Sequence, residues 1–203
     1  MHMPDPKIFT IGHSNHPIEP FVALLRQHGV TALADVRSAP YSRFNPQFNR
    51  ENLERSLKQS GIAYVFLGKE LGARSDDPAC YENGRVQYGR VADSPLFKAG
   101  LQRVIEGAGA YRLALLCAEK EPLVCHRTLL VSRALDAAGV AVAHIHADGR
   151  LESHPDAMTR LLRLLAMPEV DLFRSKEQLI AQAYAAQEQR VAYVDEKMRL
   201  GMD

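Results

Sequence analysis

The chain has 203 residues, 46% of them hydrophobic, which suits one globular domain with a sizeable core and an appendage. Its 25 lysines and arginines balance 24 acidic residues, which excludes a chain-wide field for nucleic acid or membrane and leaves any basic surface local. Three cysteines do not make a secreted disulfide framework, and no segment reads as a signal peptide or a transmembrane helix, so we expect a cytoplasmic protein with reduced thiols and no membrane partner.

The first half of the chain alternates between short apolar runs and stretches of helical periodicity. A strand is expected over residues 7–11, followed by a helix that ends at Gly29. Residues 31–36 predict the second strand, Asn49 is expected to cap the second helix, and residues 62–67 predict the third strand. Residues 68–93 show no clear pattern. Loops of that length are uncommon inside a compact domain, so this segment is a candidate lid.

The second half continues the alternation. Ser94 and Pro95 are typical of a helix start, residues 113–116 predict a buried fourth strand, and residues 128–138 predict a helix. Residues 140–146 predict the fifth strand. This order predicts an α/β fold, with a mostly parallel five-stranded sheet flanked by helices and joined by right-handed crossovers.

Beyond Gly149 the composition changes, so we divide the chain into an α/β domain, residues 1–150, and a helical C-terminal extension, residues 151–203. The extension is expected to hold a leucine-rich helix over residues 153–166 and a final helix that begins with a capping box of Ser175 and Gln178. An apolar stripe on the final helix predicts packing on the domain or on a second subunit, as a homodimer. Its members are Ile180, Tyr184, Val191, Val194 and Met198.

Polar motifs follow the first two expected strands. In Gly12-His13-Ser14, the glycine permits a close backbone approach to a ligand, while His13 and Ser14 can donate hydrogen bonds or move protons. The alternative is that His13 only hydrogen-bonds the start of the next helix. Asp35 and Arg37 point the same way from the second strand, so they either share a ligand or pair with each other.

Two further arginines, Arg43 and Arg50, lie close in sequence to Arg37 and Ser42. They favour the binding of an anion over a simple ion pair, because guanidinium groups match phosphate and carboxylate in a bidentate way.

The third motif surrounds two cysteines. Cys117 and Glu119 follow the fourth strand, and Cys125-His126-Arg127 opens the next helix, where the helix dipole and a neighbouring base favour a thiolate. The alternative is that Cys125 is a small, inert buried side chain. Because parallel strands end at one edge of the sheet, these motifs are expected to share a crevice there. The expected catalytic residues are His13, Asp35, Glu119, Cys125 and His126, and the expected substrate-binding residues are Ser14, Arg37, Ser42, Tyr88 and Arg127.

Known ligand spacings are missing from the chain. Several residues are of metal-ligand type, among them His13, Cys117 and His144, but no Cys-x2-Cys, His-Glu-x2-His or His-x3-His occurs, so no metal site is predicted. No glycine-rich dinucleotide or P-loop motif follows the first strand, so no cofactor is predicted either. The Cys-x5-Arg spacing of a phosphatase is also missing.

These motifs together resemble the signature of the domain-of-unknown-function 488 family over roughly residues 7–146. The segments that carry the resemblance are Gly12-His13-Ser14, Asp35-Val36-Arg37-Ser38 with Pro40 and Ser42, Leu71-Gly72, Cys117-Ala118-Glu119, Pro122, Cys125-His126-Arg127 and His144-Ile145. This chain has Ala73 where the family usually has a second glycine. The resemblance implies an α/β domain and supports the site, without naming a reaction.

The leading hypothesis is an enzyme, a transferase or hydrolase that uses Cys, His and Glu side chains on a small anionic, phosphate-bearing and nucleotide-like substrate. The alternative is a non-catalytic module that grips a nucleic-acid component in the same crevice. The arginines between Arg37 and Arg90 are interleaved with Tyr41, Phe44, Phe48, Tyr81 and Tyr88. A third hypothesis, thiol redox chemistry, requires Cys117 and Cys125 within bridging distance.

Overall fold

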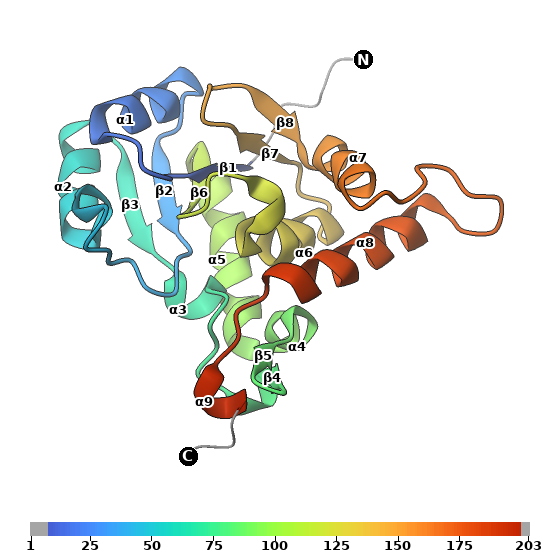
Figure 1. Cartoon of the computed structure of the whole chain (residues 1–203). Coiled ribbons are helices and arrows are strands. Elements are labelled where there is room, and N and C mark those ends of the chain that lie inside the picture. The colour runs from blue at the N-terminus through green and yellow to red at the C-terminus, as the bar shows by residue number, and fades with distance from the viewer. Residues whose placement is uncertain (1–7, 200–203) are drawn as a thin grey trace.

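The computed structural model describes residues 8–199, in which six strands form the main sheet in the order β3-β2-β6-β1-β7-β8 (Figure 1). Lys7, the expected start of the first strand, lies outside the described residues, as does the segment in which no signal peptide is expected. The strands are β1 (Ile8–Gly12), β2 (Ala32–Asp35), β3 (Ala63–Phe66), β6 (Leu113–Cys117), β7 (Val142–Ile145) and β8 (Leu151–Ser153).

Five of these strands are parallel, as predicted, and β8 is an antiparallel edge strand paired with β7. The prediction of five strands was therefore one strand short. A three-residue strand with a single apolar side chain carries no periodicity, and it forms only because Gly149, at φ +81°, turns the chain back along β7. The boundary placed at residue 150 thus divides a hairpin of the sheet.

Helices cover both faces of the sheet (Figure 1). One face packs on α1 (Ile18–Gln27) and α2 (Arg50–Gln59). The other packs mainly on α5 (Pro95–Ala110), α6 (Arg133–Ala137), α7 (His154–Leu164) and α8 (Lys176–Val191). Successive residues of a strand point to opposite faces, so in β6 Ala114 and Leu116 join the first layer while Leu113 and Leu115 join the second. All are buried, as expected for a parallel sheet covered on both sides.

The helix starts that carry clear signals form as predicted. Ser94 Oγ accepts a hydrogen bond from the Phe97 amide at 3.2 Å, and Ser175 and Gln178 form the full capping box of α8. Asn49 does precede α2, but its side chain does not cap that helix. Its Oδ1 instead accepts from the Ser42 amide at 2.7 Å, so Asn49 fixes the preceding loop.

Residues 68–93 were expected to form one long loop, a candidate lid; the loop assignment was wrong, and the lid role stays a prediction. They form α3 (Gly68–Leu71), the 3-10 turn η2 (Pro78–Cys80), the hairpin β4 (Tyr81–Glu82) and β5 (Arg85–Val86), and α4 (Tyr88–Asp93). Each element is too short to show a period. Leu71, Val86 and Val91 anchor the segment in the core.

The helix after β6 also departs from the prediction. A 3-10 turn, η3 (Pro122–Val124), is followed by a π-helical segment, η4 (Arg127–Ser132), before α6 continues in α-helical form. Ser132 Oγ donates to the Arg127 carbonyl at 2.7 Å and so occupies the acceptor at the start of the wide turn. Such π segments are frequent at functional sites.

The C-terminal extension packs on the domain of the same chain. Helix α8 buries Leu179, Ala183 and Tyr184, and Gln187 Nε2 donates to the Leu123 carbonyl at 2.8 Å. The helix ends at Val191, so Val194 and Met198 are not on it; α9 (Glu196–Arg199) follows. The inward stripe is thus used within the chain, while a homodimer through this helix stays a prediction. No helix within residues 8–199 combines the length and apolar character needed to cross a bilayer.

Candidate functional site

The carboxyl ends of β2, β6 and β1 lie next to one another in the sheet. Gly12 is in register with Cys117, and Asp35 is in register with Leu116. The segments that follow these strands therefore emerge at one edge, where ligands bind in open parallel sheets. His13, Arg37 and Glu119 all follow these strand ends directly, so the expected convergence of the motifs is present.

Asp35 and Arg37 form a buried bidentate ion pair. Arg37 Nε lies 2.9 Å from Asp35 Oδ1, and Nη2 lies 2.6 Å from Oδ2. Tyr64 also donates its hydroxyl to Oδ2 at 2.9 Å, and the Arg37 Nη2 donates to the Phe48 carbonyl at 2.9 Å. Pairing, which the sequence interpretation ranked below anion binding, therefore occupies both carboxylate oxygens. This geometry gives Asp35 the role of holding Arg37 rather than that of a free base.

His13 lies against this pair with both ring nitrogens engaged. Its Nδ1 donates to the Ser14 carbonyl at 2.8 Å, its Nε2 accepts from Arg37 Nη1 at 3.2 Å, and its ring stacks on Phe48 at 4.3 Å between centroids. Burial, and then the neighbouring Arg37 charge, lower the pKa of His13 to about 4. His13 is thus a neutral packing and hydrogen-bonding residue near pH 7.

The two serines expected to bind substrate serve the local backbone. Ser14 has a φ of +49°, and its Oγ lies 3.3 Å from Asn15 Oδ1, to which it donates. Ser42 Oγ accepts from the amides of Phe44 and Asn45 and so forms a turn. Neither serine lines the cavity described below.

Cys117, Glu119, Cys125 and His126 form one compact cluster, with sulfur, oxygen and nitrogen atoms all within 4.8 Å of one another. Glu119 Oε2 lies 2.9 Å from each sulfur. His126 Nδ1 lies 3.6 Å from Cys117 Sγ and 4.0 Å from Cys125 Sγ. These atom types could hold a metal ion, although the sequence spacing predicted none. Both cysteines are free thiols, and the thiol redox hypothesis stays a prediction.

The electrostatics of the cluster distinguish its two thiols. Burial raises the pKa of Cys117, and the neighbouring Cys125 and Glu119 raise it further. Burial acts the same way on Cys125, but the hydrogen bond from Cys117 and the charges of Arg127 and His126 outweigh it and lower the pKa of Cys125. Cys125 is therefore the first thiolate to form. Burial, followed by the charge of Cys125, raises the pKa of the Glu119 carboxyl.

His126 is oriented by one hydrogen bond. Its Nε2 donates to the Val36 carbonyl at 2.9 Å, which leaves the lone pair of Nδ1 directed at the cluster. Burial opposes its charged form, but the hydrogen bond and charge of Cys125 outweigh burial and raise the pKa of His126.

Gly12 and Arg127 hold one side of the loop between the cysteines. A Cβ atom on Gly12 would lie 1.8 Å from the Glu119 carbonyl oxygen, so only glycine permits this approach of loop to strand. Arg127 is fully buried and donates to the carbonyls of Glu119 at 2.6 Å and Lys120 at 3.2 Å. It does not line the cavity, so its geometry gives it a loop-holding role in place of the expected anion binding.

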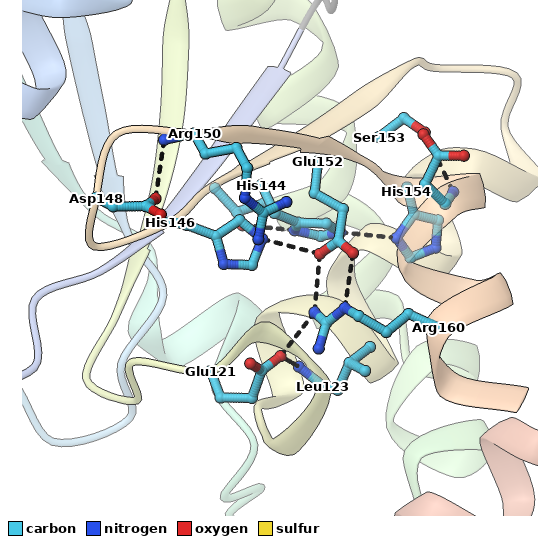
Figure 2. A network of polar contacts seen from close by, with 12 residues as sticks. Glu121, Leu123, His144, His146, Asp148, Arg150, Glu152, Ser153, His154 and Arg160 are labelled. Carbon is cyan, nitrogen blue, oxygen red and sulfur yellow. Dashed lines mark hydrogen bonds and ion pairs between the residues drawn. The ribbon is translucent and has the colours of Figure 1, made fainter. Parts of the chain in front are cut away.

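A second network holds the other side of this loop (Figure 2). Arg160 Nη2 donates to Glu121 Oε1 at 2.8 Å and to Glu152 Oε2 at 2.8 Å, and His146 Nε2 lies 2.9 Å from the same Glu152 oxygen. Glu121 in turn accepts from the Leu123 amide. The loop is thereby tied to the β7–β8 hairpin and to α7, through contacts that sequence analysis did not anticipate.

His144, considered as a ligand from the sequence, lies outside the cluster. Its Nδ1 is 2.8 Å from Thr10 Oγ1, and its Nε2 is 3.1 Å from His154 Nδ1, while His154 Nε2 is 2.7 Å from the Tyr184 hydroxyl. This buried chain joins β1, β7, α7 and α8.

A cavity of about 270 Å³ opens beside the cluster. Cys117, Glu119 and His126 line it, together with Arg37, Tyr88 and Arg74. Burial raises the pKa of Tyr88, so it presents a protonated hydroxyl. Gly72, from the family motif, is required by close contacts within the protein, since a Cβ there would lie 2.3 Å from the Gly68 carbonyl oxygen and 2.4 Å from Ser38 Oγ.

Arg74 and Tyr193 are the lining residues that sequence reasoning missed. The Arg74 guanidinium carbon lies 4.3 Å from the centre of the Tyr193 ring, and the Arg74 amide donates to Ser38 Oγ at 3.0 Å. Arg74 is exposed and has no ion pair among the described residues. Neither residue follows the end of a predicted strand. The only sequence signal for Arg74 was its place among the arginines between Arg37 and Arg90.

The fold and the site together define an α/β protein with a polar, thiol-containing pocket at the carboxyl edge of a parallel sheet. Residues 17–134 match the family described as Domain of unknown function DUF488, so the chain belongs to that family. The matched segment includes Arg37 and the whole Cys117–His126 cluster and begins after His13. No curated protein and no solved structure matches the chain.

Proposed function

We propose that this protein is an enzyme that acts on a small anionic, phosphate-bearing substrate bound in the cavity beside the cysteines. The observation that carries the proposal is the composition of one wall: proton-transferring and thiol side chains line the same cavity as Arg74, a guanidinium without a carboxylate partner among the described residues. A volume of about 270 Å³ lies at the lower end of ligand pockets, which suits a phosphorylated small molecule of nucleotide type.

Arg74 is the proposed anion-binding residue. The charge of Arg37 is neutralised by Asp35, and Arg127 is buried away from the cavity, so neither offers a free cation to a ligand. The Tyr193 ring supports the flat guanidinium of Arg74 and leaves its N–H groups for a phosphate or carboxylate.

Glu119 and His126 are the proposed proton-transfer groups. The raised pKa of the Glu119 carboxyl brings its proton exchange closer to neutral pH, and His126 presents Nδ1 because Nε2 is held by Val36. These groups suit hydrolysis or group transfer at an electrophilic atom of the substrate. The free thiols fit a reducing compartment, and we place the protein in the cytoplasm as part of the proposal.

Calorimetric titration with inorganic phosphate and the four ribonucleoside 5′-monophosphates tests the proposal. We expect binding that Arg74→Gln weakens at least about tenfold, the loss expected for one charge-assisted contact. Arg43→Gln is the matched control, because Arg43 is also exposed and also lies over an aromatic ring, that of Phe44 at 4.7 Å, outside the cavity. No binding of any probe, or equal losses in the two variants, would refute the anion site.

Turnover of the bound probes, followed by phosphorus NMR, tests the catalytic part. Glu119→Gln is expected to retain binding and lose turnover, because the amide keeps the shape of the carboxylate without its proton exchange. Binding with no turnover of any bound probe, in the wild-type protein, would favour a binding module instead.

One observation supports such a module as the second candidate. Tyr41 and Phe44 are 57% and 77% exposed, and Arg43 lies over the Phe44 ring, so this short segment could stack bases and contact phosphates. Phe48 and Tyr88, which were also expected to stack on bases, are buried and do not belong to this exposed segment. Oligonucleotide binding that weakens steeply with salt, survives Glu119→Gln and Cys125→Ala, and is lost in Phe44→Ala would favour this candidate.

A further inference from the structure

Cys117, Glu119, Cys125 and His126 each place one ligand-type atom within 4.8 Å of the other three. We infer that Cys117, Cys125 and His126, with Glu119 as the fourth ligand, bind one divalent ion of the zinc class at the wall of the cavity. The inference rests on the proposed function and changes one part of it, because with an ion bound Glu119 and His126 Nδ1 are ligands and the ion would supply the acid–base chemistry assigned to them. Metal binding itself can be measured without any substrate.

The separations between the sulfurs and His126 or Glu119 are close to those around one tetrahedral ion. With ordinary zinc bond lengths, the ligand atoms of a tetrahedral site stand roughly 3.3–3.8 Å apart. The two separations between sulfur and His126 Nδ1, 3.6 and 4.0 Å, lie at or close to this range. The two separations between sulfur and Glu119 Oε2 are 2.9 Å, so an ion would move this carboxylate outward by about 0.6 Å. Glu119 as a whole residue is exposed, so its side chain can make this shift while Gly12 and Arg127 hold its backbone.

The surroundings orient the ligands as second-shell partners do in metal sites. The hydrogen bond from His126 Nε2 to the Val36 carbonyl leaves Nδ1 as the free ligand nitrogen. The Arg127 amide donates to Cys125 Sγ at 3.4 Å, an interaction that favours thiolate over thiol. Gly12 and Arg127 fix the loop that carries Glu119.

Charge balance supports the same conclusion. Arg127 is fully buried, its Nε has no hydrogen-bond partner among residues 8–199, and its other nitrogens contact carbonyl oxygens rather than a carboxylate. A buried cation needs a negative counter-charge close by. Two thiolates, one carboxylate and one divalent ion carry a net charge of −1, which would neutralise Arg127.

Without an ion, the cluster is a poor hydrogen-bonding arrangement. A single Glu119 oxygen accepts from both sulfurs, and thiols are weak donors. Within residues 8–199, the hydrogen-bond partners of His126 Nδ1 are sulfur atoms only. A bound cation would accept the lone pairs of the two sulfurs, Glu119 Oε2 and His126 Nδ1 together.

The ligand types also select the metal class. Two thiolates and one imidazole favour zinc and related transition ions over magnesium or calcium, which take oxygen ligands. Three ligands of this kind leave the fourth position to a carboxylate that a water or a substrate oxygen can replace. Because Glu119 lines the cavity, that exchangeable position faces the proposed substrate.

Metal titration of the full chain, stripped with a chelator and kept reduced, tests the inference. We expect one Zn²⁺ per chain by mass spectrometry, and a Co²⁺ form with sulfur-to-cobalt charge transfer and the intense visible bands of a tetrahedral site. Cys117→Ser and Cys125→Ser should each weaken Zn²⁺ binding by at least about 100-fold. Cys80→Ser is the matched control, since Cys80 is also buried and free but lies outside the cluster, and it should leave stoichiometry and affinity unchanged.

Alkylation of the wild-type protein provides a test that needs no variant to fold. Zn²⁺ should slow the modification of Cys117 and Cys125 by N-ethylmaleimide and leave Cys80 unaffected. A fully reduced chain that binds neither ion, or binds them equally well in both serine variants, or shows no selective protection, would overturn the inference. Phosphate binding that depends on Arg74 in a chain that binds no metal would retain the proposed anion site alone. Metal binding without any anion binding would retain the metal site and refute the proposed anion site.

Discussion

Gly12 is the position at which one added methyl group most directly tests how the candidate site is held together. In Gly12→Ala the new Cβ would lie 1.8 Å from the Glu119 carbonyl oxygen and 3.1 Å from Arg127 Nη1. An ordinary contact needs 3.4 Å, so the carbonyl must withdraw by about 1.6 Å. The obstacle is backbone rather than a flexible side chain, and the withdrawal also breaks the hydrogen bond from Arg127 to Glu119.

The cost follows from these two effects. Overpacking of a tight site costs about 1–3 kcal/mol, and the loss of a hydrogen bond to a charged group costs about 1.5–3 kcal/mol. We therefore expect Gly12→Ala to lower the free energy of unfolding by about 2.5–6 kcal/mol. With a urea m-value of about 3 kcal/mol per M, this lowers the urea midpoint by roughly 1–2 M. Zinc affinity should fall at least about tenfold as well, because Glu119 moves with the loop.

Gly109→Ala is the matched control for this substitution. Gly109 lies in α5, and a Cβ there would meet nothing within 4 Å. Alanine should stabilise the helix by up to about 1 kcal/mol and leave metal binding unchanged. Urea unfolding followed by circular dichroism measures both variants. A Gly12→Ala protein within about 0.5 kcal/mol of the wild type would refute the argument that this glycine sets the position of the loop.

Three further predictions concern the stability of the fold. Burial holds the pKa of His154 at about 4, below its ordinary 6.5, so the unfolded chain binds a proton that the folded chain does not, and stability falls as the pH falls from 6.5 toward 4. His154 should account for about 2 kcal/mol of the stability lost between about pH 7.5 and 5.0. Urea titrations of His154→Gln should therefore show a shallower pH dependence. Arg160→Met should cost about 1–3 kcal/mol by unpairing buried Glu152, whereas Arg163→Met, which loses an exposed pair on the same helix, should stay within about 0.5 kcal/mol; equal costs would contradict the proposed network. Ser175→Ala should lower the free energy of unfolding by about 1 kcal/mol, because the capping box of α8 is lost. An unchanged midpoint of thermal unfolding in calorimetry would show that α8 does not depend on this capping box.

Local patterns in the sequence were sufficient for the architecture. Apolar runs in β1, β2, β6 and β7 predict buried parallel strands, and Ser94 and Ser175 mark helix starts, because these signals depend on neighbouring residues only. The alternation of strands and helices then places the carboxyl ends of the parallel strands at one edge of the sheet, which predicts where the candidate site lies. The segments too short for a period, β8 and residues 68–93, were outside the reach of such patterns.

The partners of each polar group were decided by the tertiary structure alone. Arg37 was assigned to an anion and lines the cavity, but its charge is neutralised by the ion pair with Asp35. Arg127 was assigned to the same anion but is buried where the cavity does not reach, and it holds the Glu119 carbonyl. The compact cluster of two cysteines, Glu119 and His126 has no recognisable spacing, since its members come from a strand end, a loop and a helix start. Sequence therefore determined at which edge of the sheet the candidate site lies, and packing in three dimensions decided which atoms face one another there.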